Sequence, residues 1–198
     1  MMKIEIKNTR LLFLYRSIFF KLNFIHFYTD DKNLKSIVEA LNIKKRRKRI
    51  IYVYEDAIRF LNNYYKDDIC DFKGNKCFVQ RKIKSNWING CCMMCPLVTD
   101  KGCPSSNITC KLIYCKEAKK KIKTLKVWDI KILKCLSPVQ RFMILAATFS
   151  SKEEAINDAY YGPIYGMLRN FKRQLKVDIN RIHNSKRRVK WTRFILLY

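Results

Sequence analysis

The sequence is poor in the residue types that most enzymes use for acid–base chemistry. It contains two histidines, His26 and His183, and only 16 acidic residues against 42 lysines and arginines. Histidine and paired carboxylates carry most general acid–base catalysis, so candidates for that chemistry are few. A glycine-rich phosphate loop, a G-x-S-x-G motif and an H-E-x-x-H motif are all absent from the sequence. If the chain is an enzyme, its cysteines are the remaining candidates for the chemistry.

Long apolar runs are also missing. The run at residues 11–15 ends at Arg16, and Lys21 and Asn23 interrupt the next one. A secretory signal needs about 7–15 apolar residues in a row, and a membrane span needs about 20. We therefore expect a cytoplasmic protein whose residues 1–28 form a strand or helix on the core. A helix lying on a membrane surface is the lesser alternative for this stretch.

Negative charge is scarce, which leaves a formal net charge of +26. Such a field attracts polyanions, among them nucleic acids and anionic lipids. A lysine-rich composition is also typical of proteins from AT-rich genomes, so charge alone does not identify a partner. The basic residues that could contact phosphates are Lys44, Lys45, Arg46, Arg47, Lys48, Arg49, Arg187, Arg188 and Lys190.

Cysteine, by contrast, is abundant and concentrated. Eight of the nine cysteines lie in residues 70–115. Cys92 and Cys95 form a C-x2-C knuckle, whose turn lets two sulfurs reach one tetrahedral ion at about 2.3 Å. Cys70 and Cys77 flank a Gly-Asn step, which predicts a turn between two short extended arms. The predicted metal ligands are Cys70, Cys77, Cys91, Cys92, Cys95, Cys103, Cys110 and Cys115.

Two kinds of site remain open, because a ligand set made only of cysteine suits structural zinc and iron–sulfur clusters alike. A disulfide framework is the minor alternative. Nine cysteines are an odd number, the adjacent pair Cys91–Cys92 is strained as a disulfide, and disulfides persist mainly outside the cytosol.

The segment from residue 90 to 115 resembles cysteine-cluster proteins of the zinc- or iron-chelating CxxCxxCC type. The likeness rests on Cys91-Cys92-x-x-Cys95, on Cys103 after a glycine, and on the closing segment from Cys110 to Cys115. Two departures are visible: the double cysteine precedes its C-x2-C partner, and the aromatic residue of the closing segment lies one place late. The resemblance covers residues 90–115 and implies metal chelation by cysteine.

Apolar periodicity predicts helices on both sides of the cysteines. We expect a mainly α-helical fold with a central irregular metal-binding segment, divided into parts 1–69, 70–115 and 116–198 of one integrated domain. The expected helices are 32–43, 50–65, 117–136, one starting at Ser137-Pro138, one after the capping boxes at 150–154, and 164–177.

The patterns favour a metal-binding protein whose downstream role is open. One alternative is a basic nucleic-acid-binding regulator with a structural zinc site, in which helices 151–161 and 164–177 resemble a helix-turn-helix. Another alternative is an iron–sulfur redox or protein-modifying enzyme. Cys135 is expected to be a core thiol, and His26 a packed or solvated residue.

Overall fold

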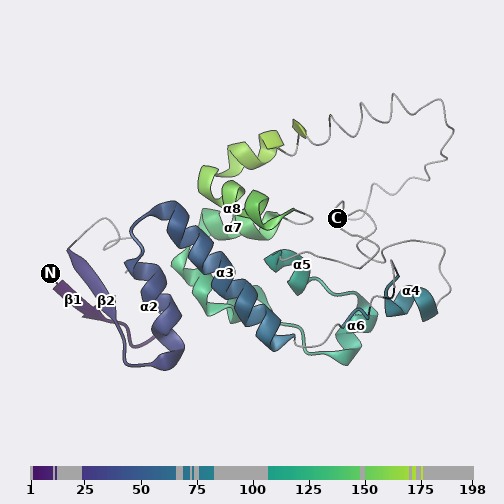
Figure 1. Ribbon diagram of the computed structural model, residues 1–198, viewed down its shortest axis with the longest axis horizontal. Coiled ribbons are helices and arrows are strands. Elements are labelled where there is room, and N and C mark those ends of the chain that lie inside the picture. Colours follow the sequence, from purple (N-terminus) through teal and green to yellow (C-terminus); the bar gives the residue numbers. More distant parts are fainter. Residues whose placement is uncertain are drawn as a thin grey trace. The chain divides into compact units, whose positions relative to one another are not determined.

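The computed structural model confirms the mainly helical fold (Figure 1). The chain forms two compact units, residues 1–163 and 164–198, and each is described by itself. Most of the predicted cysteine-rich segment lies outside the described residues. These are residues 2–10, 12, 24–65, 69–71, 73, 76–82, 107–147, 150–169, 171–172 and 175.

The N-terminal region forms a two-stranded parallel sheet. β1 (Met2–Glu5) pairs with β2 (Ile25–Tyr28). In β2, Ile25 and Phe27 are buried while His26 and Tyr28 are exposed, the alternation expected of a half-buried strand. Of the alternatives predicted for this region, Met2–Glu5 and Ile25–Tyr28 form strands, and His26 is solvated instead of packed.

Two helices follow, of which the first packs against this sheet and the second against the first. The 3-10 helix η2 (Lys32–Leu34) leads into α2 (Lys35–Asn42), and α3 spans Arg46–Tyr64. The Asn42 side chain accepts a hydrogen bond from the Phe27 N–H and donates one to the Phe27 carbonyl, both at 2.8 Å. Asn42 therefore gives the backbone N–H and carbonyl of Phe27 hydrogen-bond partners and joins α2 to the sheet.

Helix α3 begins four residues before the predicted start at residue 50. Its first turn is thus made of basic residues. The spacing predicts a buried stripe of Ile51, Tyr54, Ile58, Leu61 and Tyr65. Tyr54 and Leu61 of this stripe are fully buried, as predicted. Ile51, Ile58 and Tyr65 are half-buried, and the fully covered positions are Ile50, Val53, Tyr54, Ala57 and Leu61. The difference arises because α2, α5 (Ile108–Leu112), the 3-10 helix η5 (Lys131–Cys135) and α8 (Lys152–Tyr161) all contact α3.

The predicted helix over residues 117–136 is wrong as one element. Three short pieces replace it: α6 (Lys116–Lys121) and the 3-10 helices η4 (Val127–Asp129) and η5 (Lys131–Cys135). The backbone between α6 and η4 is bound by side chains instead. The Tyr64 hydroxyl donates to the Lys123 carbonyl at 3.2 Å, and the Leu125 N–H donates to the Tyr65 hydroxyl at 2.8 Å. These bonds compete with the helical ladder.

Helix η5 carries the ninth cysteine into the interior. Cys135 is fully buried, and its thiol lies 3.8 Å from the Ile37 carbonyl of α2 as a weak donor. The prediction that Cys135 is a core thiol is confirmed.

The capping signals after residue 136 are realised. Ser137 and Gln140 form a capping box at the start of α7 (Pro138–Ala146), and Ser151 and Glu154 form one at the start of α8 (Lys152–Tyr161). Each box satisfies two backbone donors that a helix start leaves open. Gly162 ends α8 with φ +92°, a conformation that favours glycine.

The face of α7 that was predicted to point inward is only partly buried. Met143 is buried, but Val139, Phe142 and Ala146 are exposed. Gln140 and Ile144 are covered in their place, because α7 meets its neighbours α5 and α8 on that side. Phe149 lies outside the described residues.

Beyond Gly162, residues 163–169, 171–172 and 175 are helical, as predicted for this part of the chain. Across the described ranges, no helix combines the length and the apolar character that crossing a bilayer requires.

Candidate metal centre

Half of the predicted metal ligands can be placed. Cys70, Cys77, Cys110 and Cys115 lie among the described residues, in two segments that are separate in sequence. The remaining predicted ligands, Cys91, Cys92, Cys95 and Cys103, lie outside the described residues, as do Arg187, Arg188 and Lys190.

Cys70 and Cys77 lie at the two ends of a hairpin. Lys73 and Lys76 pair as an antiparallel bridge, with N···O distances of 3.0 and 3.4 Å. One step outward, the Phe78 N–H donates to the Cys70 carbonyl at 2.9 Å. The predicted turn between two short arms is confirmed, and it brings the backbone of Cys70 beside the start of α4 (Phe78–Lys82).

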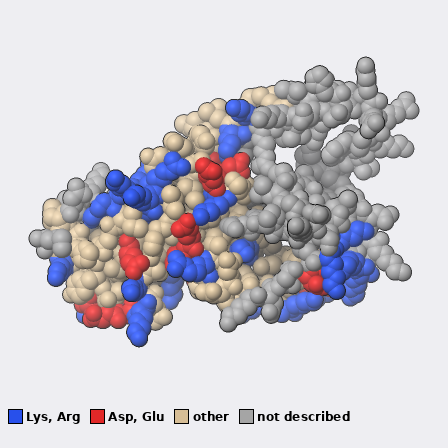
Figure 2. All heavy atoms as spheres, viewed as in Figure 1, with Lys and Arg blue, Asp and Glu red and all other residues tan. Residues whose placement is uncertain are grey.

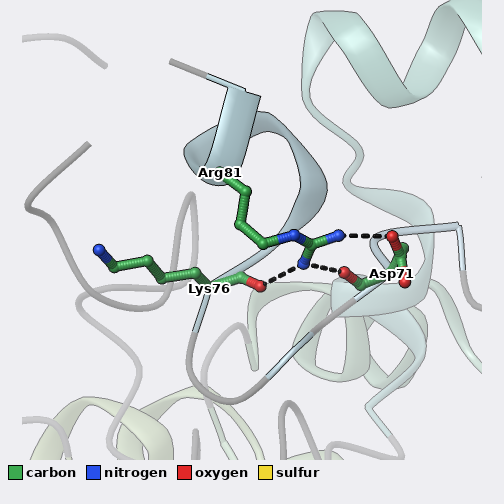
Figure 3. Close-up of polar contacts among 3 residues, drawn as sticks. All are labelled: Asp71, Lys76 and Arg81. Atoms are coloured by element: carbon green, nitrogen blue, oxygen red, sulfur yellow. Dashed lines mark hydrogen bonds and ion pairs between the residues drawn. The ribbon is translucent and has the colours of Figure 1, made fainter. Parts of the chain in front are cut away.

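Arg81 of α4 holds the two arms of this hairpin together by hydrogen bonds (Figure 3). Its guanidinium donates to the carbonyls of Asp71 and Lys76 and pairs with the Asp71 carboxylate. Asp71 has φ +42°, an uncommon conformation for a residue other than glycine. Two carbonyls from opposite arms and one carboxylate thus converge on a single side chain. The bonds lie at the surface, where the Asp71 side chain is half exposed.

Cys110 lies on a short helix that is fastened to the core. Asn107 caps α5 (Ile108–Leu112) by accepting from the Thr109 N–H, and its side chain donates to the carbonyls of Ala147 and Ser150. The Thr109 hydroxyl reaches the carbonyls of Ile144 and Leu145 at 3.2 and 2.9 Å. These carbonyls belong to the end of α7, where a helix leaves its last acceptors unsatisfied.

Tyr54 of α3 touches the same segment from the other side. It is fully buried, and burial raises its pKa to about 12, with the nearby Cys110 adding to the shift and a backbone hydrogen bond with Ile108 opposing it. Cys110 therefore lies close to a buried phenol that remains neutral well above physiological pH.

Cys115 begins the next helix. Its sulfur accepts from the Ala118 N–H at 3.5 Å, the position of an N-cap side chain. Tyr114 next to it stacks edge-on against Tyr65 at 5.2 Å, which joins this cysteine to the end of α3. The first turn of α6 also holds Glu117, whose pKa is lowered by its hydrogen bond to Lys120.

The hairpin and α6 lie side by side (Figure 1). The Lys121 ammonium of α6 lies 3.7 Å from the centre of the Phe78 ring of α4, a cation–π contact. Lys82 of α4 also contributes to lowering the pKa of Glu117. Two cysteine-bearing segments that are about 40 residues apart in sequence are therefore neighbours in space.

The thiols placed so far do not form a complete coordination shell. Within the part of the chain that the structure describes, no group of three or more His, Cys, Asp or Glu side chains could hold a metal ion. No disulfide joins two cysteines of that part either. A four-coordinate site would need thiols from residues 83–106 in addition.

The basic run at residues 44–49 has structural contacts as well as exposed charge. Arg46 and Arg47 lie 5.4 and 5.9 Å from the centre of the Tyr160 ring of α8. Lys44 donates to the Ile25 carbonyl at 3.1 Å. Arg49 is buried, with its guanidinium 3.4 Å from the Ile43 carbonyl, so it does not belong to the exposed basic surface.

Sequence reasoning missed the residues that support the cysteines. Asn107 precedes an apolar residue and Thr109, which is a usable N-cap signal, but its buried bonds to α7 cross about 40 residues. The apolar spacing predicts Tyr54 only as a core residue, and Arg81 carries no local signal, because only folding brings their partners near.

No protein-family model, curated protein or solved structure matches this chain.

Proposed function

We propose that the chain is a cytoplasmic metal-binding protein whose cysteines hold zinc or an iron–sulfur cluster. The observation that carries the proposal is the hairpin whose ends are Cys70 and Cys77, closed by the Phe78–Cys70 backbone bond and packed beside the helix that Cys115 begins. Short hairpins that place two thiols near one another are the usual framework of structural zinc sites. A reducing compartment keeps such thiols available for metal.

The charge around these cysteines supports the same proposal. Four thiolates around one divalent ion leave a net charge of about −2, which a nearby positive field stabilises. Figure 2 shows basic side chains gathered over α4 and α6. They include Arg81 and Lys82 of α4, and Lys119, Lys120 and Lys121 in the last turn of α6.

In this proposal Cys70 and Cys77 supply one half of a site. Cys91, Cys92, Cys95 and Cys103 supply the other ligands, while Cys110 and Cys115 complete the pool. A bound ion would join the hairpin to the chain that follows it, and an iron–sulfur cluster would add electron transfer.

Elemental analysis of protein purified without air tests the proposal. Bound zinc in a colourless sample, or iron and sulfide with absorbance near about 400 nm, is expected. The double variant Cys92→Ser, Cys95→Ser should lose the metal, as should Cys70→Ser, Cys77→Ser. Cys135→Ala is the matched control, because this thiol lies in the core, and it should keep the metal. Metal-free wild-type protein with a folded hairpin would overturn the proposal.

Nucleic-acid binding is the second candidate function, supported by a different surface. Lys45, Arg46, Arg47 and Lys48 are exposed at the start of α3, where Figure 2 shows basic side chains gathered. Phosphate contacts of this kind weaken steeply with salt. The double variant Lys45→Glu, Lys48→Glu should lower affinity for a mixed-sequence duplex and flatten its salt dependence. An unchanged affinity, or a flat response in the wild type, would sink this candidate.

A further inference from the structure

The helical segment that opens the second compact unit carries an exposed apolar stripe. The segment comprises residues 164–169, 171–172 and 175, and is called here the C-terminal helical segment. Five apolar side chains on it are exposed: Ile164 (75%), Met167 (72%), Leu168 (62%), Phe171 (64%) and Leu175 (44%). Single exposed apolar residues are common, but five within twelve positions make a patch that a binding partner would cover.

The spacing places these side chains on one face. Ile164, Leu168, Phe171 and Leu175 follow one another at intervals of four, three and four residues, the repeat of a single helical stripe, and Met167 borders it. The stripe is thus a continuous strip along the helix.

Basic residues flank the stripe. By helical spacing Lys172 borders it beside Leu168, and Arg169 lies farther round the helix. Lys172 is exposed and Arg169 is half-buried. The sequence continues the pattern with Arg173 and Lys176, and it contains no acidic residue between Pro163 and Val177. An apolar strip flanked only by positive charge is the pattern of helices that lie in the interface of a bilayer.

We infer that the C-terminal helical segment binds the surface of an anionic phospholipid bilayer. The stripe enters the boundary between headgroups and acyl chains, while the exposed Lys172 at its flank remains at the level of the lipid phosphates. The chain's net charge of +26 strengthens the attraction to such a surface. A nucleic acid would use the basic side but would leave the apolar stripe in water.

The stripe is tested by flotation of the full-length chain with vesicles. The two vesicle types are pure phosphatidylcholine and a mixture of phosphatidylcholine with phosphatidylglycerol. Binding is expected for the mixed vesicles and should be at least about tenfold weaker for the neutral ones. Phe171→Glu should lower binding to the mixed vesicles by roughly tenfold or more, since a phenyl ring leaves the lipid and a charge replaces it.

The matched control is Phe142→Glu on α7, because Phe142 is 65% exposed and Phe171 is 64% exposed. It makes the same chemical change at the same exposure and should leave vesicle binding unchanged. For the basic side, Lys172→Glu should lower binding by about fivefold or more at low salt, while Lys48→Glu on α3 should have a smaller effect.

Four results would overturn the inference. Binding by Phe171→Glu at the wild-type level would exclude the stripe. Equal loss in Phe171→Glu and Phe142→Glu would exclude a specific face. A large fall in thermal stability of Phe171→Glu, with no vesicle binding by the wild type, would show that the stripe packs on protein instead. Duplex DNA binding that is unaffected by Phe171→Glu, without vesicle binding, would assign the basic side to nucleic acid.

Discussion

The two cysteine-bearing regions of the first unit are held in opposite ways. Cys110 lies on α5, which buried side chains of Asn107 and Thr109 fasten to the carbonyl end of α7. Cys70 and Cys77 lie on a hairpin that depends on a surface guanidinium and one cation–π contact. Buried polar bonds resist competition from water, whereas exposed ones contribute little net free energy.

This difference indicates which region would depend on the proposed metal ion for its stability. The α5 region has a hydrophobic core beneath it, including the fully buried Ile108 and Tyr54, and can fold without one. In the hairpin and α4, one apolar side chain, that of Cys77, is buried among the residues of 69–82 that the structure describes. A short segment with so little apolar burial usually relies on a disulfide or a metal ion for its stability.

The largest expected change in stability comes from removing the Asn107 side chain, whose hydrogen bonds attach α5 to the core. Asn107→Leu should lower the free energy of unfolding by about 3 kcal/mol, because it removes an N-cap and leaves the carbonyls of Ala147 and Ser150 buried with one bond fewer each. Denaturant unfolding measures this change. Asn157→Leu, at a half-exposed position on α8, is the control and should cost less than about 0.5 kcal/mol. Equal costs would mean that α5 is not fastened in this way.

Alkaline pH should loosen the same region by a similar but smaller amount. The pKa of Tyr54 is about 12 in the folded chain, against about 10 for an unfolded tyrosine. The raised pKa makes its stabilisation fully present below pH 10 and lost as the pH rises through about 12, on the order of 2 kcal/mol. Unfolding measured across this window in the wild type and in Tyr54→Phe checks the sign. A parallel decline in both would contradict the assignment to Tyr54.

Removal of the proposed metal ion should change the amide exchange rates of the two regions by clearly different amounts. With a chelator present, amide exchange at Lys73, Lys76 and Phe78 should accelerate by about tenfold or more, because the hairpin loses its main constraint. The amides of Lys111 and Ile113, which end α5, should change by less than about twofold. Hydrogen exchange followed by mass spectrometry or NMR measures both. Equal acceleration at the two places would show that one cooperative unit contains them.

The smallest effect is expected for the guanidinium lock. Arg81→Gln should destabilise the hairpin by about 1 kcal/mol, because three acceptors lose a charged donor at a partly exposed site. The control is Lys82→Gln, which removes the same charge from the next, exposed position of α4. Metal affinity is the readout, and it should fall for Arg81→Gln more than for Lys82→Gln. The reverse order would assign the effect to net charge.

Local chemistry was the part of the fold open to prediction. Ser137 with Gln140, Ser151 with Glu154, and Gly162 act within one helical turn, and they start or end helices as expected. The turn between Cys70 and Cys77 is equally local. The prediction of one helix over residues 117–136 is wrong because Tyr64 and Tyr65, about 60 residues earlier, bind its backbone. No pattern inside that stretch contains this information.

The helical class of this protein and the starts of α7 and α8 could be predicted from residue patterns. Its strong positive charge and its eight cysteines in one segment are read directly from the residues. These follow from composition and from hydrogen bonds that close within a few residues. Three features became visible only in the folded chain. Helix α4 lies beside α6, the Asn107 side chain donates to carbonyls that follow α7, and Arg49 is buried. Such contacts join residues distant in sequence, and their free energy exists only once the chain has folded around them.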